Sequence, residues 1–303
     1  MRSLIVALAL VLVGTTPAQA CPAVIKGNGS KLHPEGVAYD RAHGRFVVGS
    51  VVHGTVSTVE RDGQAKTLVD DPALITTMGL AVRAGRLYVI NGDVGISKKS
   101  SPATLKKTAG LGIYNAWTGK KIAYYDLGAL DPSREHFGND VAVAPDGTAY
   151  VTDSYSGAIY KVKNKAEVFF RDDRLLPAGR GNGANGIVRL PNGDLLIAHS
   201  SGRALYKLSN NVLTQVTTDA PIGAPDGLLI DNGQLLAIDN TAANRVISLK
   251  STDNWTTAKV TKSVPWTDKA PTTMAKSPCG VYVLSGRLDQ LNPGTDEFWL
   301  RRW

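Results

Sequence analysis

Short apolar runs recur six times along this chain, each followed by a turn that contains glycine and then by a second apolar run. Asp-Gly and Asn-Gly turns between such runs predict β-hairpins. Several short strands recurring at a spacing of roughly 40 to 60 residues are typical of a β-propeller blade. The pattern predicts an all-β fold, a six-bladed β-propeller, with its core divided between neighbouring blades; the alternative is a β-sandwich followed by a second domain. The first runs of the six repeats begin at Gly36, Gly79, Asp140, Gly186, Gly227 and Thr272.

An oxygen-bearing residue comes immediately before the first run in four of the six repeats. These residues are Glu35, Asn139, Asn185 and Asp226. If the repeats are blades around an axis, all four side chains point at one central spot. Two carboxylates and two amide oxygens are hard ligands of the kind that Ca²⁺ prefers, although other divalent ions remain open. The alternative is that these side chains only cap hairpins.

The two remaining repeats offer no ligand at this position. Met78 and Pro271 are expected there. Four protein ligands leave room for water and a substrate oxygen, because Ca²⁺ takes six to eight oxygens. Zn²⁺ is disfavoured, since no cysteine or clustered histidine lies at the ligand positions.

The second repeat carries an insertion of about 15 residues, at about 94–111, rich in Lys, Ser and Gly. Insertions of this kind lie in loops. It follows a second run, so it is expected beside the mouth of the central channel. Both a mobile lid and a plain surface loop fit this composition.

The first 20 residues resemble a secretory signal peptide. They carry one arginine, an apolar run over 4–13 and the sequence Ala18-Gln19-Ala20, which is typical of a cleavage site. The run is too short to span a bilayer. This predicts two segments, a signal at 1–20 and one propeller domain at 21–303, in a secreted or periplasmic protein.

Two cysteines are present, Cys21 and Cys279. In a secreted chain they predict one disulfide, which joins the start of the mature chain to the last repeat. The alternatives are two free thiols or a lipid on Cys21.

The net charge of +8 does not indicate nucleic-acid binding, because the positive residues are scattered and not interleaved with aromatic residues. The chain has no phosphate-binding loop and no Gly-x-Ser-x-Gly nucleophile motif. We expect a monomer without a transmembrane segment or nucleic-acid partner, acting on a small molecule.

Four short motifs together resemble the gluconolactonase and senescence-marker (regucalcin-like) family of six-bladed calcium-dependent propellers, which has distant paraoxonase relatives. The resemblance covers all six repeats. It implies that Glu35, Asn139, Asn185 and Asp226 bind a catalytic divalent ion and that the reaction is hydrolysis of a lactone or ester. The motifs are Pro34-Glu35-Gly36, Gly138-Asn139-Asp140, Ala184-Asn185-Gly186 and Pro225-Asp226-Gly227.

The implied hydrolysis needs a base to activate water. Asp226 is the first candidate, followed by His33 and then by His136; a pair of histidines at the mouth resembles the paraoxonase arrangement. The alternative for each histidine is a hydrogen-bonded residue at the rim. Polar residues that end or follow the second runs are expected to contact substrate or to cap loops, namely Asp153, His199, Ser200, Asp239 and Asn240.

Sugar-lactonase members of the family often carry an arginine just before the first asparagine ligand. Here that neighbourhood reads His136-Phe137-Gly138. Together with Phe137, Tyr155 and Trp117, this difference favours a more apolar substrate. Two other functions remain open: a condensation or cyclisation of the strictosidine-synthase kind, and a propeller that binds a ligand or protein without catalysis.

Overall fold

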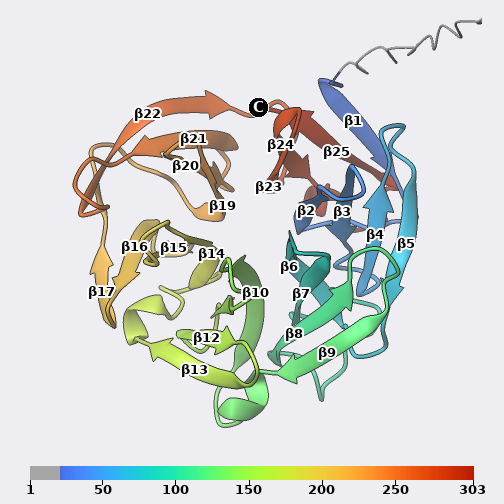
Figure 1. Ribbon diagram of the computed structural model, residues 1–303, viewed down its shortest axis with the longest axis horizontal. Helices are drawn as coiled ribbons and strands as arrows, with labels where there is room; N and C mark the ends of the chain where they lie inside the picture. The colour runs from blue at the N-terminus through green and yellow to red at the C-terminus, as the bar shows by residue number, and fades with distance from the viewer. Residues whose placement is uncertain (1–20) are drawn as a thin grey trace, which may run out of the picture.

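The computed structural model describes residues 21–303, and the predicted signal peptide lies outside them. Six antiparallel sheets of four main strands surround one axis (Figure 1), which confirms the six-bladed propeller. From the innermost strand outward they are blade one (β2 Val37–Asp40, β3 Arg45–Gly49, β4 Thr55–Val59, β5 Ala65–Asp70), blade two (β6 Thr76–Arg83, β7 Arg86–Gly92, β8 Lys107–Asn115, β9 Lys121–Asp126), blade three (β10 His136–Val143, β11 Ala149–Asp153, β12 Ala158–Val162, β13 Ala166–Arg171), blade four (β14 Ala184–Arg189, β15 Leu195–His199, β16 Ala204–Ser209, β17 Val212–Gln215), blade five (β19 Pro225–Asp231, β20 Gln234–Asp239, β21 Arg245–Lys250, β22 Thr257–Pro265) and blade six (β23 Pro271–Ser277, β24 Gly280–Ser285, β25 Glu297–Arg302, β1 Val24–Asn28).

Blade six contains both ends of the described chain. Strand β1 pairs antiparallel with β25, with Ile25 opposite Leu300. Cys21, just before β1, is bonded to Cys279 in the turn between β23 and β24. The predicted disulfide is confirmed, and it fastens the N-terminal strand to the last blade.

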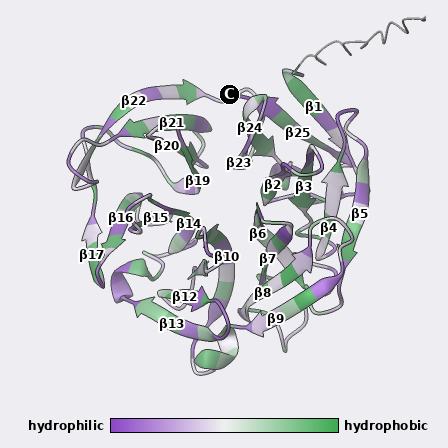
Figure 2. Ribbon diagram, in the orientation of Figure 1, coloured by the Kyte–Doolittle hydropathy of each residue, from purple (hydrophilic) through white to green (hydrophobic). Residues whose placement is uncertain are grey.

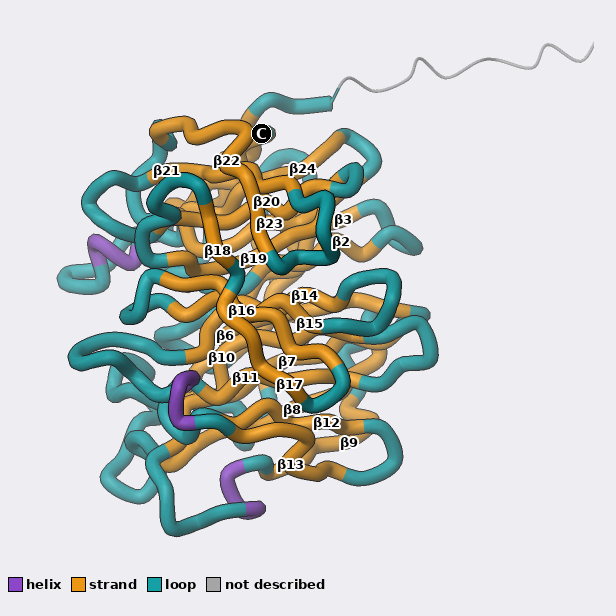
Figure 3. The backbone as a smooth tube through the Cα atoms, turned by 90° about the vertical axis from the view of Figure 1, so that its left-hand side faces the viewer, coloured by secondary structure: helices purple, strands orange, loops and turns teal. Residues whose placement is uncertain are grey.

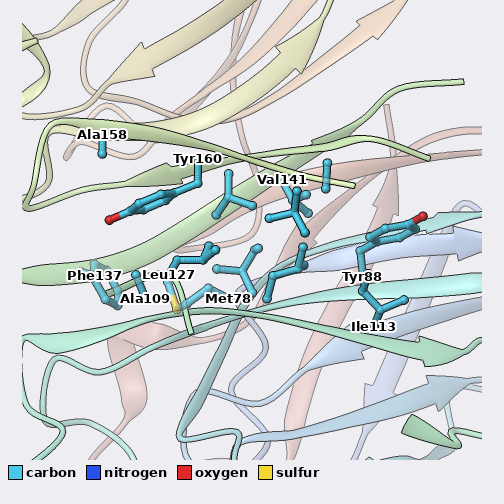
Figure 4. Packing of buried hydrophobic residues seen from close by; sticks show 14 of the residues in the cluster. Met78, Tyr88, Ala109, Ile113, Leu127, Phe137, Val141, Ala158 and Tyr160 are labelled. Carbon is cyan, nitrogen blue, oxygen red and sulfur yellow. The ribbon is translucent and has the colours of Figure 1, made fainter. Parts of the chain in front are cut away.

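The core is divided between neighbouring blades, as the repeat predicted. Six separate clusters of buried apolar side chains lie in the six gaps between adjacent blades. Figure 4 shows the cluster between blades two and three, where Met78 and Tyr88 face Val141 and Tyr160. Strands buried on both faces, such as β15, are apolar at nearly every position. Outermost strands such as β22 carry hydrophilic stretches (Figure 2).

The loops gather on two opposite faces of the propeller (Figure 3). We call the front face the one at which the innermost strands begin, and the back face the one with the short Gly turns. The short strand β18 (Thr217–Thr218) pairs with β22 and adds to blade five. A brief parallel pairing between β8 and the start of β10 joins blades two and three. Three 3₁₀ helices lie in front-face loops, at η1 Gly128–Leu130, η2 Asp173–Leu175 and η3 Leu288–Gln290. No helix in residues 21–303 is long and apolar enough to cross a membrane.

Candidate functional site

Each innermost strand of blades two to six has a β-bulge near its front end, where the pairing with the second strand shifts register. The shifts lie between Gly138 and Val141, between Ala184 and Ile187, and at the matching places of the other blades. A bulge inserts a residue and redirects its side chain. Asn139, Asn185 and Asp226 are the inserted residues, so the bulge turns their side chains out of the sheet and toward the axis.

The glycine after the bulge allows neighbouring innermost strands to approach closely. A Cβ atom on Gly36 would lie 2.1 Å from the Met78 carbonyl oxygen, and one on Gly186 would lie 2.2 Å from that of Asp226. A side chain would therefore push the blades apart at the axis. This explains the recurring pairs Glu-Gly, Asn-Gly and Asp-Gly in the sequence.

The register of blade six differs from the expectation. Pro271 pairs with Ser285, and Thr273 pairs with Leu284. Thr272, not Pro271, therefore occupies the inserted position. Its hydroxyl donates to the Glu35 carbonyl oxygen at 2.7 Å, and the side chain is 1% exposed.

The four predicted ligands come together at the front end of the axial channel, and we call them the oxygen cluster. Glu35, Asn139 and Asn185 line one cavity, and Asp226 is close enough to raise the pKa of Glu35. Within residues 21–303, no group of three or more His, Cys, Asp or Glu side chains is arranged for a metal. The oxygen cluster does not meet that criterion, because it contains only two carboxyl groups, and its other two side chains are amides.

Partners behind the oxygen cluster fix the orientation of both amides. Asn139 Nδ2 donates to Ser154 Oγ at 2.9 Å, and Asn185 Nδ2 donates to Ser200 Oγ at 2.8 Å. Each serine then donates to a backbone carbonyl of the next blade, at 2.7 Å in both cases. The Oδ1 atom of Asn139 is left buried with no hydrogen-bond partner. Buried acceptors are rarely unpaired, so this oxygen is available to a ligand.

Asp226, the fourth predicted ligand, is held by an asparagine and not by a serine. Asp226 is an acceptor, and Asn240 occupies the place of the serines and donates from Nδ2 to Asp226 Oδ2 at 2.8 Å. Ser200 and Asn240 were expected to contact substrate or cap loops. In the structure they hold members of the oxygen cluster, and substrate contact by either residue stays a prediction.

In the part of the chain that the structure describes, no cationic side chain forms an ion pair with Glu35, Asp140 or Asp226, and none contributes to the pKa shifts of these groups. Burial, then Asp226 and Asp140, raise the pKa of Glu35 well above its usual value. Burial raises the pKa of Asp226 to about 6, although hydrogen bonds from Asn240 and Asn185 act in the opposite direction. Carboxyls crowded in this way are stabilised by a bound cation.

Asp140 is a third carboxyl at the axis that the sequence reasoning missed. It stands where blades one, two, four and five have glycine, and it accepts hydrogen bonds from the backbone N–H of Val141 and of Ile187 in blade four. Burial raises its pKa to about 7 against these bonds. The break in the glycine pattern was the available signal.

The two predicted histidine bases lie away from the cavity lining. His33 is 2% exposed, and its ring contacts the Arg287 carbonyl oxygen and the Thr295 N–H. His136 is 1% exposed, and its ring lies between the Asp153 carboxylate, at 2.7 Å, and the Asp131 carbonyl oxygen, at 2.8 Å. Both fit the alternative of a hydrogen-bonded rim residue. Of the three predicted bases, Asp226 alone belongs to the oxygen cluster.

The other predicted substrate residues have structural partners. Asp153 is fully buried and accepts from the backbone N–H of Phe137, and Asp239 accepts from that of Ala224 and pairs with Arg245. His199 Nε2–H donates to the Leu176 carbonyl oxygen at 2.8 Å, and its Nδ1 accepts from the N–H of Gly202 at 2.9 Å. These contacts are those of loop caps, and substrate contact by these residues stays a prediction.

The aromatic residues divide between the two faces. Phe137 is 2% exposed and packs against half-buried Tyr155, with ring centroids 5.5 Å apart, on the front face. Trp117 is 58% exposed and stacks on His43 in the back-face turns. It is therefore remote from the predicted channel mouth.

The blade-two insertion is shorter as a loop than expected. Strand β8 already begins at Lys107, so the connection spans residues 93–106. Asp93 accepts hydrogen bonds from Ser100 and Thr104 within it, and the Lys98 N–H donates to the Val52 carbonyl oxygen of blade one. The loop is thus fastened to the neighbouring blade on the front face.

The contacts of His136 predict a pH dependence of stability. Burial lowers the pKa of His136, but hydrogen bonds to Asp153 and to the Asp131 carbonyl outweigh it, so the pKa is raised above its usual 6.5. A raised pKa stabilises the fold fully below 6.5, and this contribution is lost as the pH rises through the folded-state value. We expect the free energy of unfolding, measured in urea with calcium present, to fall as the pH rises above about 6.5.

The matched comparison is between two buried histidines. His136→Gln should flatten this alkaline decline, while His199→Gln should retain it, because the ring of His199 contacts backbone atoms and no carboxylate. An alkaline decline of equal slope in all three proteins would contradict the assignment.

The comparisons with known proteins identify the fold. No family model matches the chain, and no curated protein matches its sequence. The crystal structure of the Malassezia sympodialis allergen Mala s 1 matches with a TM-score of 0.76 at 17% identity, over 93% of this chain and 96% of that one. A gluconolactonase from Xanthomonas campestris matches with a TM-score of 0.63 at 17% identity, over 91% and 88%.

Virginiamycin B lyase from Staphylococcus aureus also matches, with a TM-score of 0.59 at 15% identity, over 92% of this chain and 99% of that one. Identities this low establish a shared fold and not a shared activity. The resemblance noted in the sequence is therefore upheld for the architecture: this chain has the propeller fold that gluconolactonases share with a lyase and a fungal allergen.

Proposed function

We propose that this chain is a secreted or periplasmic, monomeric, calcium-dependent hydrolase that opens a lactone or another ester. The observation that carries the proposal is the oxygen cluster, in which two buried carboxyls with raised pKa values and two oriented amides face one point without a cationic side chain. The unpartnered Asn139 oxygen fits the same ligand. The gluconolactonases among the structural neighbours support the reaction class.

The donor set suits calcium better than zinc or a soft metal, because every donor is oxygen and two are charged. A bound Ca²⁺ would polarise the substrate carbonyl and stabilise the negative charge that develops on its oxygen. Glu35, Asn139, Asn185 and Asp226 would hold the ion. Ser154, Ser200 and Asn240 keep the amides and Asp226 turned toward it.

Asp226 is the group that would accept the proton of the attacking water. Its pKa of about 6 leaves it ionised near neutral pH, and its Oδ2 is held by Asn240. A bound cation would lower this pKa further, so Asp226 would be ionised and able to accept a proton when calcium is present. His33 and His136 would have to give up backbone or carboxylate partners to take this role.

A panel of lactones and aryl esters, followed by pH indicator with calcium and then with chelator, tests the proposal. Calcium-dependent acid release, with a product heavier than the substrate by one water, is the expected result. A ring-opened product of unchanged mass would indicate elimination, the class that the lyase neighbours represent by name. Calcium binding without turnover of any substrate would favour a binding propeller.

The serine partners can be tested without turnover. Ser200→Ala removes the acceptor of Asn185 and frees its amide to rotate, so we expect calcium affinity to fall roughly 10- to 100-fold. Ser285→Ala is the control, because Ser285 is a fully buried serine at the corresponding end of a blade-six strand, and its hydroxyl has no hydrogen-bond partner. Calorimetric titration of calcium would show equal affinities in both variants if the serine has no orienting role.

A further inference from the structure

The axial channel continues behind the oxygen cluster toward the back face. A cavity of about 300 Å³ begins at Glu35, Asn139 and Asn185 and extends along the innermost strands to Arg189. A second cavity of about 650 Å³ shares four wall residues with it and reaches the exposed back-face turns at Arg41 and Gly85. The shared wall residues are Val37, Leu80, Leu229 and Met274. The two cavities therefore form one channel that is open at the back.

The chemistry of the channel wall changes along its length. The front end carries the carboxyls, and the middle is lined by half-buried apolar side chains of three blades, among them Val143, Val188 and Leu229. The strand from Asn185 to Arg189 covers roughly 13 Å at the usual rise per residue. A volume near 300 Å³ with apolar walls and a few polar groups is typical of a small-molecule site.

The back end of the channel is positively charged. Arg189 lines the inner cavity, and Arg41 and Arg83 line the outer one. Within residues 21–303, the ion pairs of the structure include none of these three arginines, whereas Lys276 at the same mouth is paired with Asp231. Asp40, a carboxylate that lines the outer cavity, is paired with His43 and Arg45, so it leaves these three arginines without an ion-pair partner in the described residues.

Arg189 shows the clearest unmet interaction. Its Nε atom is buried and has no hydrogen-bond partner, and its Nη1 makes one long bond, 3.4 Å, to the Leu190 carbonyl oxygen. A buried guanidinium N–H without an acceptor is costly, and a carboxylate is the acceptor that fits an arginine best. This feature is independent of the oxygen cluster and points to an anion.

We propose that the channel binds an amphipathic carboxylate, a fatty-acid-like molecule, from the back face. The apolar chain lies between the innermost strands, and the carboxylate lies at Arg189 within the positive field of Arg83 and Arg41. The reverse orientation would place the anion beside Glu35 and Asp140, whose like charges repel it. This site goes beyond the proposed hydrolysis and does not depend on it.

Decanoate is the probe, titrated calorimetrically into protein freed of calcium by chelator, where no bound cation draws the anion to the oxygen cluster, with decanol as the uncharged comparison. We expect one decanoate per chain, weaker binding of decanol, and a loss on the order of tenfold in Arg189→Gln, because one charged hydrogen-bonded contact is removed. Val188→Phe, which narrows the apolar section, should also weaken decanoate binding while calcium binding persists.

Arg86→Gln is the matched control. Arg86 is an exposed back-face arginine that lines neither cavity, so the variant changes net charge equally and should bind decanoate like the wild type. No measurable decanoate binding would overturn the proposal. Equal losses in Arg86→Gln and Arg189→Gln would also overturn it, because they would reveal general attraction to a basic surface.

Discussion

Glu35→Gln should abolish the response of this protein to calcium and reduce calcium-dependent hydrolysis at least about a hundredfold. The substitution keeps the shape of the side chain but removes one of the two charges in the oxygen cluster. Ligand binding stabilises a fold by about 2.7 kcal/mol when the ligand is at 100 times its Kd. For a chain of this size, this corresponds to a rise of roughly 5–10 °C in Tm, which the variant should lose.

Without calcium the same variant should be at least as stable as the wild type at neutral pH. Glu35 is 8% exposed, and burial, followed by Asp226 and Asp140, raises its pKa, so its ionised form is unfavourable when no cation is bound. Replacing a crowded buried carboxyl by an amide removes that repulsion. A mutation that only damages the fold would lower both melting temperatures, so the two measurements separate loss of the ion from loss of structure.

Glu135→Gln is the control for this experiment. Glu135 lies in an exposed front-face loop beside Lys106, so the variant carries the same chemical change on the same face. It should keep both the calcium shift and the turnover. If Glu35→Gln also keeps them, the oxygen cluster is not a calcium site and the hydrolytic proposal fails with it.

The architecture was predictable because each repeat carries its own evidence. Every blade has two apolar runs joined by a turn with glycine, so the prediction of six blades did not depend on any one segment. The position of the oxygen cluster followed from the same periodicity, since Glu35, Asn139, Asn185 and Asp226 share one place in the repeat. A feature that recurs in phase with a repeat is the kind that a single sequence can reveal.

The sequence predictions were wrong where local bulges and strand ends depart from the regular repeat. Blade six was read one residue out of register, because a bulge shifts the pairing between Pro271 and Thr273. The insertion in blade two was read as loop beyond Lys106, because its polar composition continues into β8. Polar residues at strand ends were expected to contact substrate or to cap loops, and Asp153 and Asp239 make the contacts of loop caps.

Long-range pairing was the other limit. Nothing near residues 24–28 in the sequence shows that they complete a sheet with Glu297–Arg302. The cysteines were the one signal that these distant segments meet, and they gave the connection but not the strand register. The basic mouth of the channel was also hidden, because Arg41, Arg83 and Arg189 are scattered in the sequence and converge only in the fold.

Breaking the disulfide should produce the largest loss of stability among single substitutions in the described part of the chain. The bridge joins residues 258 positions apart, so it closes a loop that contains nearly all of residues 21–303. The chain-entropy model gives about 5 kcal/mol for loops of this order. We therefore expect Cys21→Ser to lower Tm by roughly 10–20 °C in thermal unfolding experiments.

If the covalent bond itself stabilises the fold, the single and double cysteine variants should have the same Tm. Cys279→Ser should match Cys21→Ser, and the double variant should lose no more than either one, because all three lack the same bond. Reductant should lower the Tm of the wild type to that of the variants and leave the variants unchanged. Strand β1 keeps its pairing with β25 and the buried Ile25 in every case, so the ring is loosened at its closure and not opened. Additive losses in the double variant would mean that each cysteine contributes by packing, and that the covalent closure of blade six contributes little.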